Sequence, residues 1–479
     1  MSGFGGLSSL PFMRSIFSSL LAPFAFSLFV VGCGGSDSGT SSATPGVGGS
    51  AGAGGSAAAG AGGGATAGSG GTATAGTTAA GGAAGTGTAG AGGSGGSDVG
   101  GAGGSDAGGA GGSDVGGAGG SDMGGSAAFV PAAHGPFPKA TNVPKSVVLK
   151  DVQLVTITFA GYAYKDKVEA FGDFVVGSSW MKEWTSEWNV GTGAHVAKVV
   201  IPEAPAATMN DADIPKWILA KIADGTLPAP PDPMNNDFLY QIYYPKGVQI
   251  TGDVGVSCQD YAGYHSNTDE VAGATTRVAY SVNMTNCPGS PEPSSVIFTA
   301  SHEINEAVLD PLPQNTTFWG WGFRNQFNPW GLFGSETADA CEDLGVSEGG
   351  FPLTRVWSNV NAVAGTDPCI PKPPGDIMYD VSATPTTTQY LAPGASIAYT
   401  LSGWSESAIA DWKLSAFAYN GTINPKSTLS ANTINNGGQV TLTLTMPASA
   451  KSGDYATVLI YSRRSSSDYH FWPVAVAVK

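Results

Sequence analysis

Apolar residues between positions 128 and 376 follow the strand period in some segments and the helix period in others. Alternating runs rich in β-branched and aromatic residues predict strands over 147–159, 238–244 and 277–282. Apolar residues at helical spacing predict one helix or two short helices over 167–187, and further helices over 214–223 and 294–309. This mixture of strands and helices predicts an α+β domain over residues 128–376.

Residues 377–479 carry a different pattern, in which short alternating runs are separated by Gly, Pro and Asn turns. The runs cover 389–391, 396–401, 413–419, 439–446, 455–462 and 471–478. No helical period is evident among them. These six runs within about 100 residues come close to the seven short strands typical of an immunoglobulin-like β-sandwich, and we predict that fold for this region.

Residues 34–127 have almost no side chains that could form a core. This stretch contains more than half of the chain's 72 glycines, and most of its other residues are Ala, Ser and Thr. Burial of so little side chain cannot offset the backbone entropy lost on folding. We therefore predict a disordered Gly-rich tether.

The first 33 residues resemble an export signal. Arg14 is the only charged residue, and an apolar run leads into Val30, Val31, Gly32 and Cys33. That ending resembles the bacterial lipobox, in which the cysteine is acylated after cleavage. The resemblance implies a signal peptide over 1–33 and a lipid anchor at Cys33. Gly34 in the next position favours the outer membrane or cell surface as the destination.

The charge balance narrows the class of partner. The formal net charge is −16, and only 12% of the residues are charged. Nucleic-acid binding needs a positive surface, so we expect no nucleic-acid partner. The predicted membrane contact is made through the lipid anchor alone.

Four cysteines remain when Cys33 is set aside: Cys258, Cys287, Cys341 and Cys369. An even number in an exported chain predicts two disulfides, for which three connectivities exist. Pairing nearest neighbours would close loops of about 30 residues, each stabilising by roughly 3–4 kcal/mol. A metal cluster of cysteines is the alternative, but no two are spaced as zinc ligands usually are.

The helix predicted over 294–309 carries the residues best suited to chemistry. It contains His302, Glu303 and Glu306. Positions 302 and 306 lie one helical turn apart on the same face, so an imidazole and a carboxylate could bind one cation. Apolar neighbours such as Ile304 and Val308 would hold the helix against the core.

This helix resembles the His-Glu-x-x-His helix of the zincins, with Glu306 in place of the second histidine. The resemblance implies that His302 and Glu306 bind zinc and that Glu303 activates the bound water. In glutamate-type zincins a later Glu-x-x-x-Asp stretch supplies the third ligand. We therefore expect Glu336 as the third ligand, with Asp339 as its partner or substitute. His265 is a further candidate if its loop comes close.

Several segments resemble the phosphate-induced protein family, which comprises the plant EXORDIUM-like proteins and their secreted bacterial relatives. These segments are 238–245, 258–265, 287–289, 301–306 and 336–342. The resemblance covers roughly residues 145–372 and implies a zincin-like domain in an extracellular or wall-associated protein.

The resulting expectation is a surface lipoprotein with a tether, a zincin-like domain and a C-terminal sandwich. The zincin-like domain would act as a metal-dependent hydrolase on a peptide or wall polymer, with Zn²⁺ or another divalent ion as cofactor. The alternative is a non-catalytic module that binds wall or matrix material through a structural or vestigial metal site. Glu303 distinguishes the two, because only catalysis requires it.

Overall fold

The computed structural model of the protein describes residues 128–252, 255–285, 287, 291–325 and 328–479. The expected signal segment 1–33 with Cys33 and the expected tether 34–127 lie outside these residues. The described chain is mostly β-structure with few helices. None of its helices combines the length and the apolar character needed to cross a membrane.

A five-stranded sheet in the order β2-β1-β4-β8-β7 forms the centre of the first part of the described chain. Its strands are β1 (Gln153–Phe159), β2 (Ala194–Ile201), β4 (Phe238–Tyr244), β7 (Gly263–Asn267) and β8 (Ala279–Met284). β7 runs antiparallel to β8 at one edge, whereas the other four strands are parallel. β4, β7 and β8 are buried along their whole length, as expected for strands covered on both faces.

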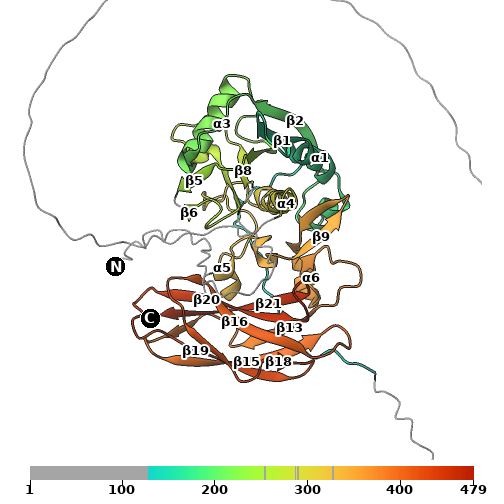
Figure 1. Ribbon diagram of the computed structural model, residues 1–479, viewed down its shortest axis with the longest axis vertical. Coiled ribbons are helices and arrows are strands. Elements are labelled where there is room, and N and C mark those ends of the chain that lie inside the picture. Colours follow the sequence, from blue (N-terminus) through green and yellow to red (C-terminus); the bar gives the residue numbers. More distant parts are fainter. Residues whose placement is uncertain (1–127, 253–254, 286, 288–290, 326–327) are drawn as a thin grey trace, which may run out of the picture. The chain divides into compact units, whose positions relative to one another are not determined.

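Helices cover both faces of this sheet (Figure 1). α1 (Lys165–Val175), α2 (Ser179–Thr185) and α4 (Ser294–Leu309) share one apolar core with Leu154 and Leu239. α3 (Ile214–Ala223) packs in a second core with Val155 and Ile157. Successive strand residues point to opposite faces, so the alternation of the strands assigns each side chain to one of the two helical layers.

The expected elements agree with the structure in most places. α3, α4 and β4 have the predicted bounds, and the stretch 167–187 forms the pair α1 and α2. The strand expected from residue 147 begins only at Gln153, because the Leu149 amide donates to the Val308 carbonyl oxygen (2.9 Å) at the end of α4. The strand expected over 277–282 lies at Ala279–Met284, since the Arg277 amide instead donates to the Pro233 carbonyl oxygen (2.7 Å).

Shorter elements connect these parts. They are β3 (Thr208–Asn210), β5 (Gln249–Gly252), β6 (Gly255–Val256), β9 (Gly345–Glu348), β10 (Phe351–Thr354), β11 (Val356–Trp357), β12 (Cys369–Ile370), α5 (Pro329–Phe333), α6 (Asn359–Ala364), and the 3₁₀ turns η1 (Asp211–Asp213), η2 (Thr268–Glu270) and η3 (Asp339–Cys341).

Residues 377–479, all of which the structure describes, form two β-sheets and contain no helix. The sheets have the orders β13-β15-β19-β17 and β14-β21-β20-β16-β18 (Figure 1). Their strands are β13 (Tyr379–Thr384), β14 (Gln389–Leu391), β15 (Ser396–Ser405), β16 (Trp412–Gly421), β17 (Lys426–Leu429), β18 (Thr433–Ile434), β19 (Gln439–Thr445), β20 (Tyr455–Arg463) and β21 (Tyr469–Val478). Side chains from both sheets, such as Leu442 and Val458, share one core.

Aromatic side chains join this two-sheet region to the rest of the described chain. Phe137 packs against Trp357, Trp404 and Trp472, with ring centroids 5.5–5.9 Å apart. The α4 face of the mixed sheet and the interior of the two-sheet region consequently belong to one continuous apolar core. The change of sequence pattern near residue 377 gives no sign of this shared packing.

The expectation of two disulfides is confirmed. Cys258 bonds to Cys287, and Cys341 bonds to Cys369. The first bond links the segment before β7 to the segment after β8. The second links η3 to β12 and so fixes the chain beside α4.

Candidate metal centre

α4 carries three of the expected site residues into the interior. His302, Glu303 and Glu306 are all at most 2% exposed. The helix packs against β7, β8 and β10, with Val296, Ala300 and further apolar residues in the core. Buried ionisable groups are costly unless other groups compensate them, so this helix must be matched by partners on neighbouring segments.

The first set of partners surrounds His302. Its Nε2 atom lies 2.8 Å from Glu306 Oε1 and 3.4 Å from Asp339 Oδ1. Despite these short distances, Nε2 is buried and has no hydrogen bond of acceptable geometry. The Asp339 amide also donates to Glu306 Oε1 (3.3 Å), which ties η3 to the helix.

A second set surrounds His265 on β7. Its Nε2 atom lies 3.1 Å from the Asp310 carbonyl oxygen. Its Nδ1 atom lies 3.5 Å from Glu306 Oε2 and 3.8 Å from Glu303 Oε2. The two oxygens of Glu306 therefore face two different histidines.

Asp339, rather than the expected Glu336, joins His302 and Glu306 in one candidate ligand set. Glu336 Oε1 instead lies 3.6 Å from His265 Nε2, on the side of that ring away from Glu303 and Glu306. The two acids lie in a turn and the start of η3, where helical spacing does not predict which carboxylate faces the helix. His265, named from sequence only as a further candidate, lies near these residues because β7 runs beside α4. We refer to the six residues joined by these contacts as the cluster: His265, His302, Glu303, Glu306, Glu336 and Asp339.

The electrostatics of the cluster reflect its excess of carboxylates. Burial opposes ionisation of Glu306, but the two histidines outweigh it and lower its pKa to about 2. Burial and the charge of Glu306 raise the pKa of Glu336 to about 8 and that of Asp339 to about 6. Burial lowers the pKa values of His265 and His302, yet their carboxylate neighbours raise both well above the usual range. Protons therefore supply the positive charge that a metal ion could supply.

One disulfide and two tyrosine hydrogen bonds hold the segment that bears Asp339. The Cys341–Cys369 disulfide fixes the end of η3. The Tyr419 hydroxyl of β16 donates to Glu342, and the Tyr469 hydroxyl of β21 donates to the Asp343 carbonyl oxygen (3.2 Å). Residues from the two-sheet region thus help to position a carboxylate of the cluster.

Aromatic residues of the segment 318–323 pack against other parts of the described chain. Trp321 contacts Trp188 with ring centroids 4.6 Å apart, and Phe323 contacts Trp357 at 5.2 Å. Arg324, which the sequence analysis did not single out, pairs with Asp310 and lies over the Trp319 ring. Through this pair it braces the residue whose carbonyl oxygen faces His265.

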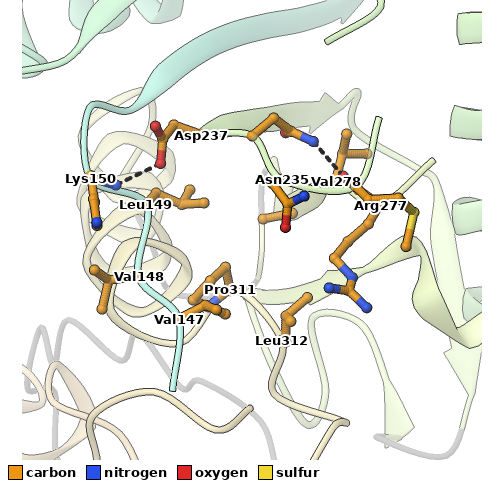
Figure 2. Close-up of a pocket in the computed structure, with 13 residues that line it drawn as sticks. Val147, Val148, Leu149, Lys150, Asn235, Asp237, Arg277, Val278, Pro311 and Leu312 are labelled. Atoms are coloured by element: carbon orange, nitrogen blue, oxygen red, sulfur yellow. Dashed lines mark hydrogen bonds between the residues drawn. The ribbon is translucent and has the colours of Figure 1, made fainter. Parts of the chain in front are cut away.

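A pocket of about 250 Å³ lies beside the end of α4 (Figure 2). Its lining combines apolar residues with Lys150, Asp237 and Arg277. Pro311 and Leu312 reach it directly after Asp310, but none of the six cluster residues lines it. The pocket is therefore a neighbour of the candidate centre and does not contain it.

The donor set fits a divalent transition-metal ion. Ligand atoms about 2.0–2.1 Å from a tetrahedral zinc lie roughly 3.4 Å apart. The distance from His302 Nε2 to Asp339 Oδ1 is 3.4 Å, and that to Glu306 Oε1, at 2.8 Å, would lengthen slightly around an ion. Imidazole with two carboxylates suits zinc and also manganese or iron. Such an ion could polarise a carbonyl group and lower the pKa of a bound water.

No family model and no curated protein matches the chain. Solved structures resemble it over 21–22% of its length. They include domains 4 and 5 of the S-layer protein SbsC (15% identity, TM-score 0.17, 54% of that chain), a nucleoside hydrolase-related hypothetical protein from Saccharophagus degradans (15%, 0.17, 25%) and WR4, a C. elegans MSP family member (12%, 0.16, 97%). The chain spans about half the length of the first and a quarter of the second. Likenesses at these TM-scores support no conclusion about function.

Proposed function

We propose that this protein is a divalent-metal-dependent hydrolase, with zinc as the first candidate ion. One observation carries the proposal. His302 Nε2 is buried without a hydrogen-bond partner, yet it lies 2.8 Å from Glu306 Oε1 and 3.4 Å from Asp339 Oδ1. A cation between this nitrogen and the two carboxylate oxygens would stabilise the arrangement.

The charge balance supports the same proposal. Four carboxyl groups meet two imidazoles in the cluster: Glu303, Glu306, Glu336 and Asp339 with His265 and His302. In the part of the chain that the structure describes, no lysine or arginine forms an ion pair with Glu306, Glu336 or Asp339. A divalent ion would take the place of the protons that otherwise compensate these carboxyl groups, and its binding would release them.

Glu303 is the residue to which we assign the proton transfer. It follows His302 on α4 and is fully buried. A bound metal would polarise the substrate carbonyl group and make its own water acidic. Glu303 would accept the proton of that water, while His302, Glu306 and Asp339 hold the geometry.

We also propose a zincin-like fold for the first part of the described chain and an immunoglobulin-like fold for the second. The first part of the described chain is zincin-like in that a His-Glu-x-x-Glu helix packs against a mixed five-stranded sheet. The second part is immunoglobulin-like in that two sheets enclose one apolar core. We assign the first part to the EXORDIUM-like proteins because of the sequence segments that resemble them.

We further propose that the protein is exported and lipid-anchored at the cell surface through Cys33. Two disulfides favour an oxidising compartment, and the lipobox-like ending of the signal segment supplies the anchor. A clickable fatty acid should label the wild type but not Cys33→Ala. Equal labelling of the two would contradict the anchor.

A structural metal in a non-catalytic surface-binding protein is the second candidate, and the burial of the cluster favours it. The side chains of His302 and Glu306 are only 1–2% exposed, whereas those of Glu336 and Asp339 are 17% and 16% exposed and form the more accessible side of the centre. For the protein to act as a hydrolase, a peptide or a wall polymer must therefore reach the centre from that side.

Metal content and hydrolysis together separate these candidates. The purified chain, stripped with a chelator and reloaded with Zn²⁺, should hold bound zinc and cleave a mixed peptide library or cell-wall preparation. Glu303→Gln should keep zinc at His302 and lose cleavage, whereas His302→Ala should lose that zinc. Zinc binding without cleavage would favour the structural candidate, and absence of zinc binding would overturn the proposal.

A further inference from the structure

The Glu306 carboxylate is placed between two histidines rather than beside one. Oε1 faces His302 Nε2 at 2.8 Å, and Oε2 faces His265 Nδ1 at 3.5 Å. Each of these nitrogens also faces a second carboxylate, Asp339 for His302 and Glu303 for His265. The cluster therefore contains two candidate ligand sets that share Glu306.

The orientation of His265 makes Nδ1 a candidate metal ligand. Nε2 lies 3.1 Å from the Asp310 carbonyl oxygen, and a carbonyl oxygen can only accept a hydrogen bond. Nε2 consequently carries the hydrogen, which leaves the lone pair of the neutral ring on Nδ1. Metal-binding histidines are commonly oriented by such a bond from the other ring nitrogen.

The distances around Nδ1 fit a shared cation better than a direct hydrogen bond. At 3.5 and 3.8 Å, the oxygens of Glu306 and Glu303 are beyond the usual hydrogen-bond length for a ring N–H donor. They are close to the roughly 3.4 Å that separates ligand atoms around a tetrahedral zinc. His265 is only 3% exposed, so the ring lies in the interior together with these carboxylates.

We infer that the cluster holds two divalent ions bridged by Glu306. His302 and Asp339 complete the first site, and His265 and Glu303 complete the second. Hydrolases with paired ions keep them about 3.5–4 Å apart, a distance that one bridging carboxylate spans. Arg324 and Asp310 are positioning residues, because their ion pair holds the carbonyl oxygen that orients His265.

The inference rests on the proposed metal centre and changes the role of one residue in it. With a second ion present, Glu303 would be a ligand and not the proton acceptor. The metal content of Glu303→Gln distinguishes these roles, since loss of a ligand removes an ion whereas loss of a proton acceptor does not.

The test is the metal stoichiometry of the full chain after chelator treatment and reloading with Zn²⁺ or Mn²⁺, measured by plasma mass spectrometry. Two ions per chain are expected for the wild type, and one each for His265→Ala, His302→Ala and Glu303→Gln. Mn²⁺ in the wild type should give an exchange-coupled electron paramagnetic resonance spectrum, and in His265→Ala an uncoupled six-line spectrum. His195→Ala is the matched control, because His195 pairs with Asp173 outside the cluster, and it should retain two ions.

The outcomes separate this inference from the proposed function. Two coupled ions without hydrolysis would support the paired site and overturn the hydrolase. One ion in the wild type that persists in His265→Ala would overturn the paired site, even if hydrolysis is found. Should His265→Ala fail to fold, the isosteric Glu303→Gln decides, and its retention of every wild-type ion would overturn the inference.

Discussion

Asp339 and Glu336 are three residues apart, yet their carboxyl groups face different histidines. Asp339 reaches His302 Nε2, whereas Glu336 reaches the Nε2 side of His265. Asp339→Asn should therefore weaken zinc binding by about 10-fold or more, because a neutral amide is a poorer ligand than a carboxylate. Glu336→Gln should change it by much less, in competition titrations against a chelating dye. An equal loss in both variants would restore Glu336 as a ligand.

Asp380 is a buried carboxyl group outside the cluster. It lies on β13, and its Oδ1 atom accepts hydrogen bonds from Ser462 Oγ and the Val381 amide, both at 2.7 Å. Burial raises its pKa to about 8, against these two hydrogen bonds. The folded protein therefore favours the neutral form, and ionisation destabilises the fold as pH rises from the unfolded pKa of about 3.9 towards 8.

Asp380→Asn should thus become more stable than the wild type as pH rises. The difference should be near zero at about pH 4, grow by up to ~1.4 kcal/mol per pH unit, and level off above about pH 8. Urea unfolding at several pH values measures it, with the exposed Asp411→Asn as control. A difference independent of pH would show that Asp380 is charged in the folded state.

For the individual residues of the site, the sequence predicts only those neighbours that share one face of a helix. His302 and Glu306 were predicted as neighbours because i and i+4 residues share a helix face, and they are 2.8 Å apart. The choice of Asp339 over Glu336 depends on a turn stabilised by a disulfide and by packing against distant strands. The approach of His265 depends on strand order, which spacing along the chain does not reveal.

Among the elements, the contact between β7 and α4 determines whether the cluster can form. A Cβ atom on Gly263 would lie 2.5 Å from Thr299 Cγ2 and 2.8 Å from Glu303 Oε1. Gly263→Ala should therefore separate strand and helix and destabilise the fold by ~1–3 kcal/mol. Gly177→Ala is the matched control, since a Cβ there meets nothing within 4 Å.

Urea unfolding and zinc titration of the two glycine variants measure both consequences of this contact. Gly263→Ala should weaken zinc binding as well as stability, because Glu303 and His265 lie on the two elements that move apart. Equal stability and equal zinc affinity of the two variants would mean that β7 can move away from α4 without loss of free energy. The need for a glycine at position 263 could not be predicted from the sequence, because it depends on which helix packs against β7.

At the scale of the whole molecule, the mixed sheet and the two-sheet region share one apolar core. Phe333 of α5 packs against Tyr419 and Phe471 at ring distances of 5.0 and 5.1 Å. Scanning calorimetry of the full chain should therefore show one cooperative transition for the two regions. Phe333→Ala should lower the free energy of unfolding by the ~3–5 kcal/mol usual for a buried Phe, and should therefore shift the midpoint of the single transition to a lower temperature. Two transitions, of which only one shifts, would show that the regions unfold independently.

The sequence predicted the order of these two regions but not their joint core. The alternation of 377–479 is visible in the sequence alone because each strand has one buried face. The packing of Phe137 on Trp404 and Trp472 brings together residues hundreds of positions apart. Hydrophobicity marks such residues as buried but does not identify the residues they contact.

The Cys341–Cys369 disulfide has a consequence for the order in which the protein matures. Asp339 lies two residues before Cys341, within the same 3₁₀ turn. While the cysteines are reduced, the segment that bears Asp339 lacks one of the contacts that hold it beside His302, and the proposed centre would bind metal more weakly. If the protein is exported as proposed, a newly made chain would gain its full affinity for metal only after oxidation. The metal that occupies the centre would then be set by the supply outside the cytoplasm rather than by intracellular metal homeostasis.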